Sequence, residues 1–379
     1  MSTTPNSLLS PVRRLSLATR LLALACALIG AAASAAELAA PRTVTIAVVR
    51  DGPSSLLDGI DTAFRAEART LTAGRATLVF KDDPAFDAGW RDGGAAALDA
   101  ALTDPAIDCV FALGTRVTGA ASARPLSKPV FGTLVQEADL VPLPIGADGR
   151  STKGNFAVVA FPSRAADQLS DLRALVSFTS LQIVIDEFLA PDRAALEAWR
   201  SRLAQSLHVP VRLVPAATQA GETLAALGSD GGAVLLFPCI RMDELNRAAL
   251  LSGLSARKFP VLGFLGRPDV EAGALAGLLP DARAALARRL AVNLDQLIAG
   301  APVASLPLRV NLPAQLYYNE ATATAIGFSP DFDALTRAVV VGHSAPSSGP
   351  PLNFVDALAA AAKGNFDFMA QQSATESSR

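Results

Sequence analysis

Polar and charged side chains follow the apolar runs of this sequence, at positions where strands are predicted to end. Asp51, Ser54 and Ser55 follow the first run, and Arg241 and Arg267 follow runs in the second half of the chain. Parallel strands present their carboxyl ends at one edge of a sheet, where open α/β sheets bind ligands. The pattern therefore predicts a binding site. The complete set of candidate ligand-binding residues is Asp51, Ser54, Ser55, Thr115, Arg116, Gln136, Glu137, Asp186, Glu187, Arg241 and Arg267.

These residue types have defined binding chemistry. An arginine can hold a carboxylate through two parallel hydrogen bonds, and a helix amino end with nearby hydroxyl groups can bind an anion. The acids Asp186 and Glu187 can bind an amine. Each candidate also has a purely structural interpretation: Ser54 or Ser55 can cap the following helix, and Asp51 can belong to a turn. The other charged candidates could instead be ordinary surface side chains that contact solvent and no ligand.

The sequence lacks the motifs of common enzyme classes. It has no nucleophile elbow, no P-loop and no Gly-x-Gly-x-x-Gly opening a helix. His208 and His343 lie far apart, without other metal-binding residues at ligand spacing, which argues against a metal site. Cys109 and Cys239 belong to apolar runs of different predicted lobes, which favours buried free thiols over a disulfide. We expect a binding protein that is not an enzyme and has no cofactor.

Two tryptophans and two adjacent tyrosines are further aromatic candidates for the site. Trp90 and Trp199 lie in or beside helical patterns, which favours packing over ligand contact. Tyr317 and Tyr318 lie in a segment expected near a hinge, where one of them could face the ligand. Burial at the lobe junction is the alternative for both tyrosines.

Apolar runs alternate with helical patterns along most of the chain. Strands are predicted at 43–49, 76–80, 108–113 and 129–134, and a second series follows at 181–185, 209–214, 233–237 and 259–265. Parallel strands need crossover helices and are buried on both faces. We therefore predict an α/β protein with two Rossmann-like lobes of four parallel strands each. The expected boundaries are 42–154 for the N-terminal lobe, 155–280 for the C-terminal lobe and 281–340 for a segment that returns across the hinge.

The first 35 residues have the composition of a cleavable export signal. Three arginines and no acidic residue accompany a small apolar run at 21–33, which ends at an Ala-Ser-Ala cleavage site. Cleavage at 35 removes three of the 33 basic residues and none of the 35 acidic ones, so the net charge becomes −5. A chain of this charge without a basic stripe is not expected to bind nucleic acid. We expect a periplasmic protein without a transmembrane span in its mature chain.

The carboxyl half of the sequence resembles a known family. The segments are VLGFLGRPDVE at 261–271, GALA at 273–276, RRLAVNL at 288–294 and NEATATAIGFSP at 319–330. They are similar to the substrate-binding proteins of ABC transporters that have a type I periplasmic fold, and the resemblance covers about 42–340. It implies two hinged lobes that close on a small ligand, amino-acid-like or aromatic, and an ABC permease as partner.

The last segment resembles a different kind of protein. Residues 345–351, APSSGPP, have the composition of a linker, and 352–379 are expected to form a helical tail. The run LNFVDAL at 352–358 resembles the opening of a TolC-like outer-membrane efflux protein, although Phe366 replaces the usual proline. A generic alanine-rich helix is the alternative. The resemblance implies a subgroup associated with or fused to efflux proteins, and the chain would then be a fragment or a vestige of such a fusion.

Two functions of different classes follow. The first is a periplasmic solute-binding receptor linked to ABC-type transport. The second is a sensor or adaptor module of an outer-membrane efflux system whose cleft no longer binds a ligand. A cleft without convergent polar groups would favour the second function.

Overall fold

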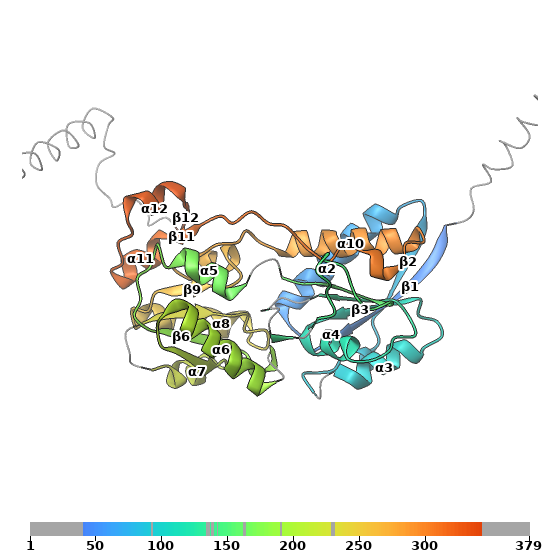
Figure 1. Cartoon of the computed structure of the whole chain (residues 1–379), viewed down its shortest axis with the longest axis horizontal. Helices are drawn as coiled ribbons and strands as arrows, with labels where there is room; N and C mark the ends of the chain where they lie inside the picture. Colours follow the sequence, from blue (N-terminus) through green and yellow to red (C-terminus); the bar gives the residue numbers. More distant parts are fainter. Residues whose placement is uncertain are drawn as a thin grey trace, which may run out of the picture.

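The computed structural model describes residues 41–91, 94–133, 137, 140–141, 143–161, 164–189, 192–228 and 232–342. They form two α/β lobes that lie side by side (Figure 1). The expected export signal, the linker, the tail and Gln136 lie outside the described residues. Within the described ranges, no helix has both the length and the apolar character needed to cross a membrane.

The first lobe is built on a parallel sheet of five strands in the order β2-β1-β3-β4-β5. Alternate residues of each strand face opposite sides, so each face needs its own helical cover. Val48 and Phe111 pack with the residues of α2 and α10, whereas Val49 and Val110 pack with those of α3 and α4. The bounds are β1 Arg42–Arg50, α2 Ser55–Thr72, β2 Ala76–Lys81, α3 Ala95–Thr103, β3 Cys109–Leu113, α4 Thr115–Ser122, β4 Val130–Thr133, β5 Phe156–Val159 and α10 Arg283–Ile298.

The second lobe contains a seven-stranded sheet in the order β12-β11-β10-β9-β8-β6-β7. All neighbouring strands are parallel except β10 and β11. The bounds are α5 Ala165–Leu172, β6 Leu181–Ile185, α6 Arg193–Leu207, β7 Val211–Pro215, α7 Ala220–Ala226, β8 Ala233–Leu236, α8 Glu244–Ala256, β9 Val261–Gly263, α9 Arg267–Glu271, β10 Ala276–Gly277, β11 Tyr317–Asn319, α11 Glu320–Ile326, α12 Phe332–Arg337 and β12 Val339–Val341.

The division between the sheets differs from the sequence prediction. The segment at the start of the expected second lobe forms β5, which pairs with β4 in the first sheet, with Phe156 opposite Val130. The two sheets therefore have five and seven strands instead of four each. The run Phe156–Val159 is buried on both faces, and such a run carries no local information about which sheet it joins. The expected boundary at 154 thus falls before the last strand of the first lobe.

The chain passes between the lobes three times. It leaves the first lobe between β5 and α5, returns between β10 and α10, and leaves again between α10 and β11. The segment expected to cross the hinge is accordingly divided between the lobes: α10 packs against α2, and β11 and β12 complete the second sheet. Cys109 and Cys239 are buried free thiols in different lobes, which confirms that prediction.

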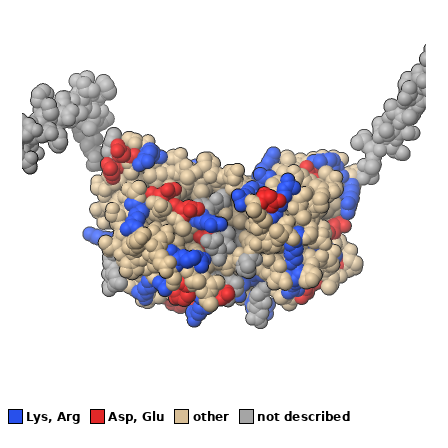
Figure 2. Space-filling model, viewed as in Figure 1, with Lys and Arg blue, Asp and Glu red and all other residues tan. Residues whose placement is uncertain are grey.

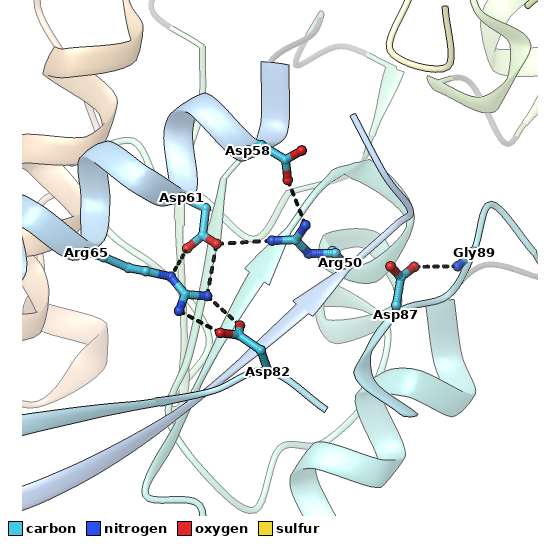
Figure 3. Close-up of polar contacts among 7 residues, drawn as sticks. All are labelled: Arg50, Asp58, Asp61, Arg65, Asp82, Asp87 and Gly89. Atoms are coloured by element: carbon cyan, nitrogen blue, oxygen red, sulfur yellow. Dashed lines mark hydrogen bonds and ion pairs between the residues drawn. The ribbon is translucent and has the colours of Figure 1, made fainter. Parts of the chain in front are cut away.

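An ion-pair network fixes α2 against the first sheet (Figure 3). Asp61 on α2 accepts hydrogen bonds from Arg50 at the end of β1 and from Arg65 one helical turn later. Arg65 also reaches Asp82 after β2, and Arg50 reaches Asp58. Asp61 is the most buried of these acids, with a side chain 9% exposed. The network ties α2 to two strands and so fixes where the amino end of the helix lies.

Replacement of Asp61 should destabilise the protein more than replacement of Asp58. Asp61→Ala leaves two half-buried arginines with one partner each, and we expect the free energy of unfolding to fall by about 2 kcal/mol, between the values for exposed and buried ion pairs. Asp58 has a side chain 53% exposed, so Asp58→Ala should cost less than about 1 kcal/mol. Urea denaturation measures both, and equal losses would contradict the central role of Asp61.

Candidate functional site

A cavity of about 330 Å³ lies between the two lobes. The first lobe contributes the start of α2, including Ser54, Ser55 and Ile60. The second lobe contributes the segment that follows β8, the segment that follows β9, and one side of α8. Phe161 and Asp281, from two of the segments that cross between the lobes, complete the wall. The cavity thus adjoins both lobes and the segments that connect them.

The cavity wall is apolar over most of its area, with a few polar groups. Ile60, Phe161, Ile240, Met242, Leu265 and Leu286 are among the apolar residues that line it. The polar residues are Ser54, Ser55, Glu244, Arg247, Asp281 and Arg283. An apolar cavity with a few convergent polar groups is the usual composition of a site for a small organic molecule.

Two of the charged residues are held by acidic partners. Arg283 donates from Nε and Nη2 to the Asp281 carboxylate, at 2.6 to 3.0 Å. Arg247 donates from Nη2 to Asp269, a residue that is 1% exposed and also accepts the backbone N–H of Leu265. Burial raises the pKa of Asp269, against the opposing effect of the Arg247 charge. The guanidinium groups are therefore fixed in place at the cavity wall.

A second region of the lobe interface is occupied by side chains of the protein itself. Phe188, which follows β6, meets Trp90 of the first lobe edge to face, with ring centroids 5.0 Å apart. Arg116 donates from Nε to the Phe188 carbonyl at 2.8 Å, and its guanidinium lies 4.5 Å from the Phe188 ring centroid. The Trp90 ring also lies on Gly52, where a Cβ atom would be 2.6 Å from the indole. These contacts join the two lobes directly.

Phe188 is held on the second lobe by an ion pair. Asp186, 1% exposed, accepts the backbone N–H of Phe188 at 3.0 Å. Arg241 donates from Nη2 to the same carboxylate at 2.6 Å, and its guanidinium lies 5.8 Å from the Phe188 ring centroid. Arg241 and Arg116 thus flank Phe188 from the two lobes.

Asp51 organises the opposite wall of this region. Its carboxylate is completely buried and accepts the backbone N–H groups of Arg116 and Val117 at 3.0 and 2.8 Å, at the first turn of α4. Burial raises the pKa of Asp51 to about 6, while these hydrogen bonds act in the opposite direction. Gly114 lies so close that a Cβ atom would be 2.5 Å from the carboxylate.

The structure separates the sequence-predicted residues into three groups. Ser54 and Ser55 line the cavity. A second group lies around the Phe188 contact and consists of Asp51, Thr115, Arg116, Asp186 and Arg241. The third group lies elsewhere: the buried Glu137 carboxylate accepts the N–H of Ala165 at the start of α5, Glu187 pairs with Arg193 and Arg267 pairs with Glu271.

Several residues of the site were not expected from the sequence. Trp90 was expected to lie in or beside a helix and to pack instead of contacting a ligand. It does pack, but with a left-handed φ of 61° and against Phe188 of the other lobe. Phe188 and Arg247 were not candidates because nothing local distinguishes them from ordinary apolar or surface helical residues. Asp281 and Arg283 carried a weak signal, since they lie where the chain was expected to begin its return across the hinge.

The described part of the chain contains no group of three His, Cys, Asp or Glu residues able to hold a metal ion. On the face shown in Figure 2, basic and acidic side chains are intermingled over both lobes.

No protein-family model and no curated protein matches the sequence. Solved structures match its fold. An ABC domain from Streptococcus pneumonia in complex with L-Trp matches with TM-score 0.59 and 17% identity, over 78% of this chain and 99% of that one. A conserved domain protein from Vibrio cholerae matches with TM-score 0.61 and 16% identity, over 79% and 99%. A ligand-free, open substrate binding protein with adhesive properties from Clostridium difficile matches with TM-score 0.53 and 14% identity, over 80% and 100%.

These matches confirm the predicted fold. The chain has the two-lobed α/β architecture of type I periplasmic binding proteins.

The titration of Asp51 should be measurable as a pH dependence of stability. The pKa of this carboxyl rises from 3.8 to about 6 on folding, so the proton is held more tightly in the folded state. The resulting stabilisation is complete below pH 3.8 and is lost as the pH rises through about 6. The variant Asp51→Asn cannot titrate. The free energy of unfolding of the wild type, relative to that of the variant, should fall by about 2 to 3 kcal/mol between about pH 4 and about pH 7. A difference independent of pH, measured by urea denaturation, would contradict this account.

Removal of the Phe188 ring should weaken the contact between the lobes. In Phe188→Ala, Trp90 and Arg116 lose the ring they contact. We expect a more open average arrangement and a larger radius of gyration in small-angle X-ray scattering. Phe80→Ala is the matched control, because Phe80 contacts only residues of the first lobe among its ring and cation partners. Equal radii for Phe188→Ala and the wild type would show that this contact does not hold the lobes together.

Proposed function

We propose that this protein is an extracytoplasmic solute-binding receptor that holds a small ligand in the cavity between its lobes. The observation that carries the proposal is the composition of the cavity wall. The wall combines α2 of one lobe, α8 of the other and two crossing segments, so a ligand there contacts both lobes and the segments that connect them. A ligand that contacts both walls only in the closed form increases the fraction of protein molecules that are closed.

The size and polarity of the cavity indicate the kind of ligand. About 330 Å³ is near the lower limit for small-molecule sites, which favours one compact molecule. The apolar wall suits an aromatic or aliphatic body, and the polar residues suit a single polar head group. An amino-acid-like or aromatic compound has this combination. The complex of one structural neighbour with L-Trp supports the choice.

The proposal includes export and a transport partner. The composition of residues 1–35 supports delivery to the periplasm through a cleavable signal. A closed receptor of this fold would then be recognised by an ABC permease. The resemblance of residues 352–358 to an efflux protein supports a further association with an outer-membrane efflux system.

An adaptor function is the second candidate, and one observation favours it. Around Phe188 the lobes already contact each other through Trp90 and Arg116. Asp186 and Arg241 likewise pair with each other, so this part of the interface is filled from within the protein. A module whose lobes stay closed without a ligand could serve as a fixed contact surface for an efflux channel.

A compound screen distinguishes the two functions. We expect at least one compound among amino acids, aromatic acids, nucleosides and sugars to raise the melting temperature. A ligand at about one hundred times its Kd stabilises the folded state by about 3 kcal/mol. If every compound leaves the melting temperature unchanged, the adaptor function is favoured instead.

Intrinsic fluorescence provides a readout of closure. The chain has two tryptophans: Trp199 is 2% exposed in the second lobe, and Trp90 lies at the lobe contact. In the variant Trp199→Phe, Trp90 alone reports on the interface. A ligand that closes the lobes should change its emission, whereas the same ligand should leave the emission of Trp90→Phe almost unchanged. Identical responses of the two variants would argue against closure.

A further inference from the structure

The first-lobe wall of the cavity carries hydrogen-bond donors that the protein does not use. The first intrahelical bond of α2 runs from the N–H of Asp58 to the carbonyl of Ser54, at 2.8 Å. Ser55, Leu56 and Leu57 form the first turn of α2, so their N–H groups have no carbonyl partner within the helix. These three N–H groups make no hydrogen bond to any residue that the structure describes. The amino end of an 18-residue helix also carries a partial positive charge.

Ser54 supplies an independent sign of a ligand at this helix end. It is the residue that precedes the helix, where a serine side chain usually accepts an N–H of the first turn. Here its hydroxyl makes no such bond, and none to any other described residue. Ser54 is only 8% exposed and lines the cavity. A hydroxyl that stands at the cavity wall without a partner among the described residues is available to hydrogen-bond to a ligand there.

The second-lobe wall presents a fixed cation. Arg247, on α8, lines the cavity with a side chain 26% exposed. Its bond to Asp269 uses Nη2, and the described residues offer no partner to Nε or Nη1. Asp269 also packs closely against the backbone of Gly263, because a Cβ atom on Gly263 would be 2.2 Å from the Asp269 Cβ. One edge of the guanidinium fork is thus occupied, and another remains available for a second anion.

From these two walls we infer that the ligand carries a carboxylate, which bridges the lobes between the amino end of α2 and Arg247. Ser54 and Ser55 donate to it from the first lobe, and the guanidinium donates from the second. This inference rests on the proposed receptor function and names the chemical class of its ligand. Figure 1 shows that α2 and α8 belong to different lobes.

The other charges around the cavity limit how much negative charge a ligand can carry, because Arg247 is already paired with Asp269. Asp281 and Arg283 neutralise each other, and Glu244 adds a negative charge at the start of α8. A group of higher negative charge would be repelled by Glu244, whereas a carboxylate has the planar geometry that a guanidinium fork binds. The apolar residues of the wall then hold the body of the ligand. Because the two donors lie on different lobes, the carboxylate itself favours closure.

Binding of matched acids and amides tests the inference. The probes are L-tryptophan, L-phenylalanine, L-leucine and indole-3-propionate, each compared with its carboxamide by isothermal titration calorimetry on the purified protein. Loss of a charged hydrogen-bonding partner should weaken binding by about tenfold or more, so we expect the acids that bind to exceed their amides by that factor. Equal affinities for acid and amide would overturn the inference and leave the receptor function intact. If no acid or amide binds, and nucleosides and sugars also fail, the receptor function is rejected and the inference with it.

Variants of both walls test the two contacts separately. Arg247→Gln should reduce the preference for acid over amide by about tenfold. The double variant Ser54→Ala and Ser55→Ala removes the first-lobe hydroxyls without disturbing Asp269, so it tests the site even if Arg247→Gln folds poorly. Arg288→Gln is the matched control, because it removes a positive charge from an exposed residue of α10 that pairs with Glu67 and does not line the cavity. The bridge is overturned if the serine variant and folded Arg247→Gln keep an unchanged preference, or if Arg288→Gln shows an equal loss.

Discussion

The buried carboxylate of Asp51 organises the cleft-facing side of the first lobe. It stands at the end of β1, and by accepting two N–H groups of α4 it fixes the loop that follows β3. The carbonyl of the same residue accepts the N–H of Trp90, which holds the indole over Gly52. Arg116, one of the two residues whose N–H groups Asp51 accepts, donates from its side chain to the Phe188 carbonyl of the other lobe. One desolvated charge, offset by helix N–H groups, therefore positions most of the first lobe's contribution to the interface.

The interface between the lobes is divided into two regions of different chemistry. Around Phe188 the charged and aromatic side chains contact one another, so this region is filled by the protein's own residues. In the cavity the helix amino end, Ser54 and part of Arg247 remain without described partners. Polar groups that are already paired gain little from a ligand, whereas unpaired buried groups gain a full hydrogen bond. Specificity is therefore expected in the cavity, and the Phe188 region is expected to set the balance between open and closed forms.

The cavity adjoins the connections between the lobes. Phe161 and Asp281 belong to crossing segments and also line the cavity. In the proposed receptor, motion about these segments would change the cavity shape directly. The ion pairs of Asp61 attach α2 to its sheet, so the helix end that faces the cavity is held in place relative to the first lobe.

The sequence by itself determined the α/β class, the two-lobe architecture and the order of most strands, because the alternation of buried strands and crossover helices is a local pattern. It also placed Ser54 and Ser55 at the cavity, since residues that follow a parallel strand must lie at the cleft edge. Tertiary structure alone decided that β5 joins the first sheet, that Phe188 meets Trp90 and that Arg247 is held by Asp269. These features depend on contacts between segments far apart in the chain. The spacing of residues along a strand or helix does not predict such long-range contacts.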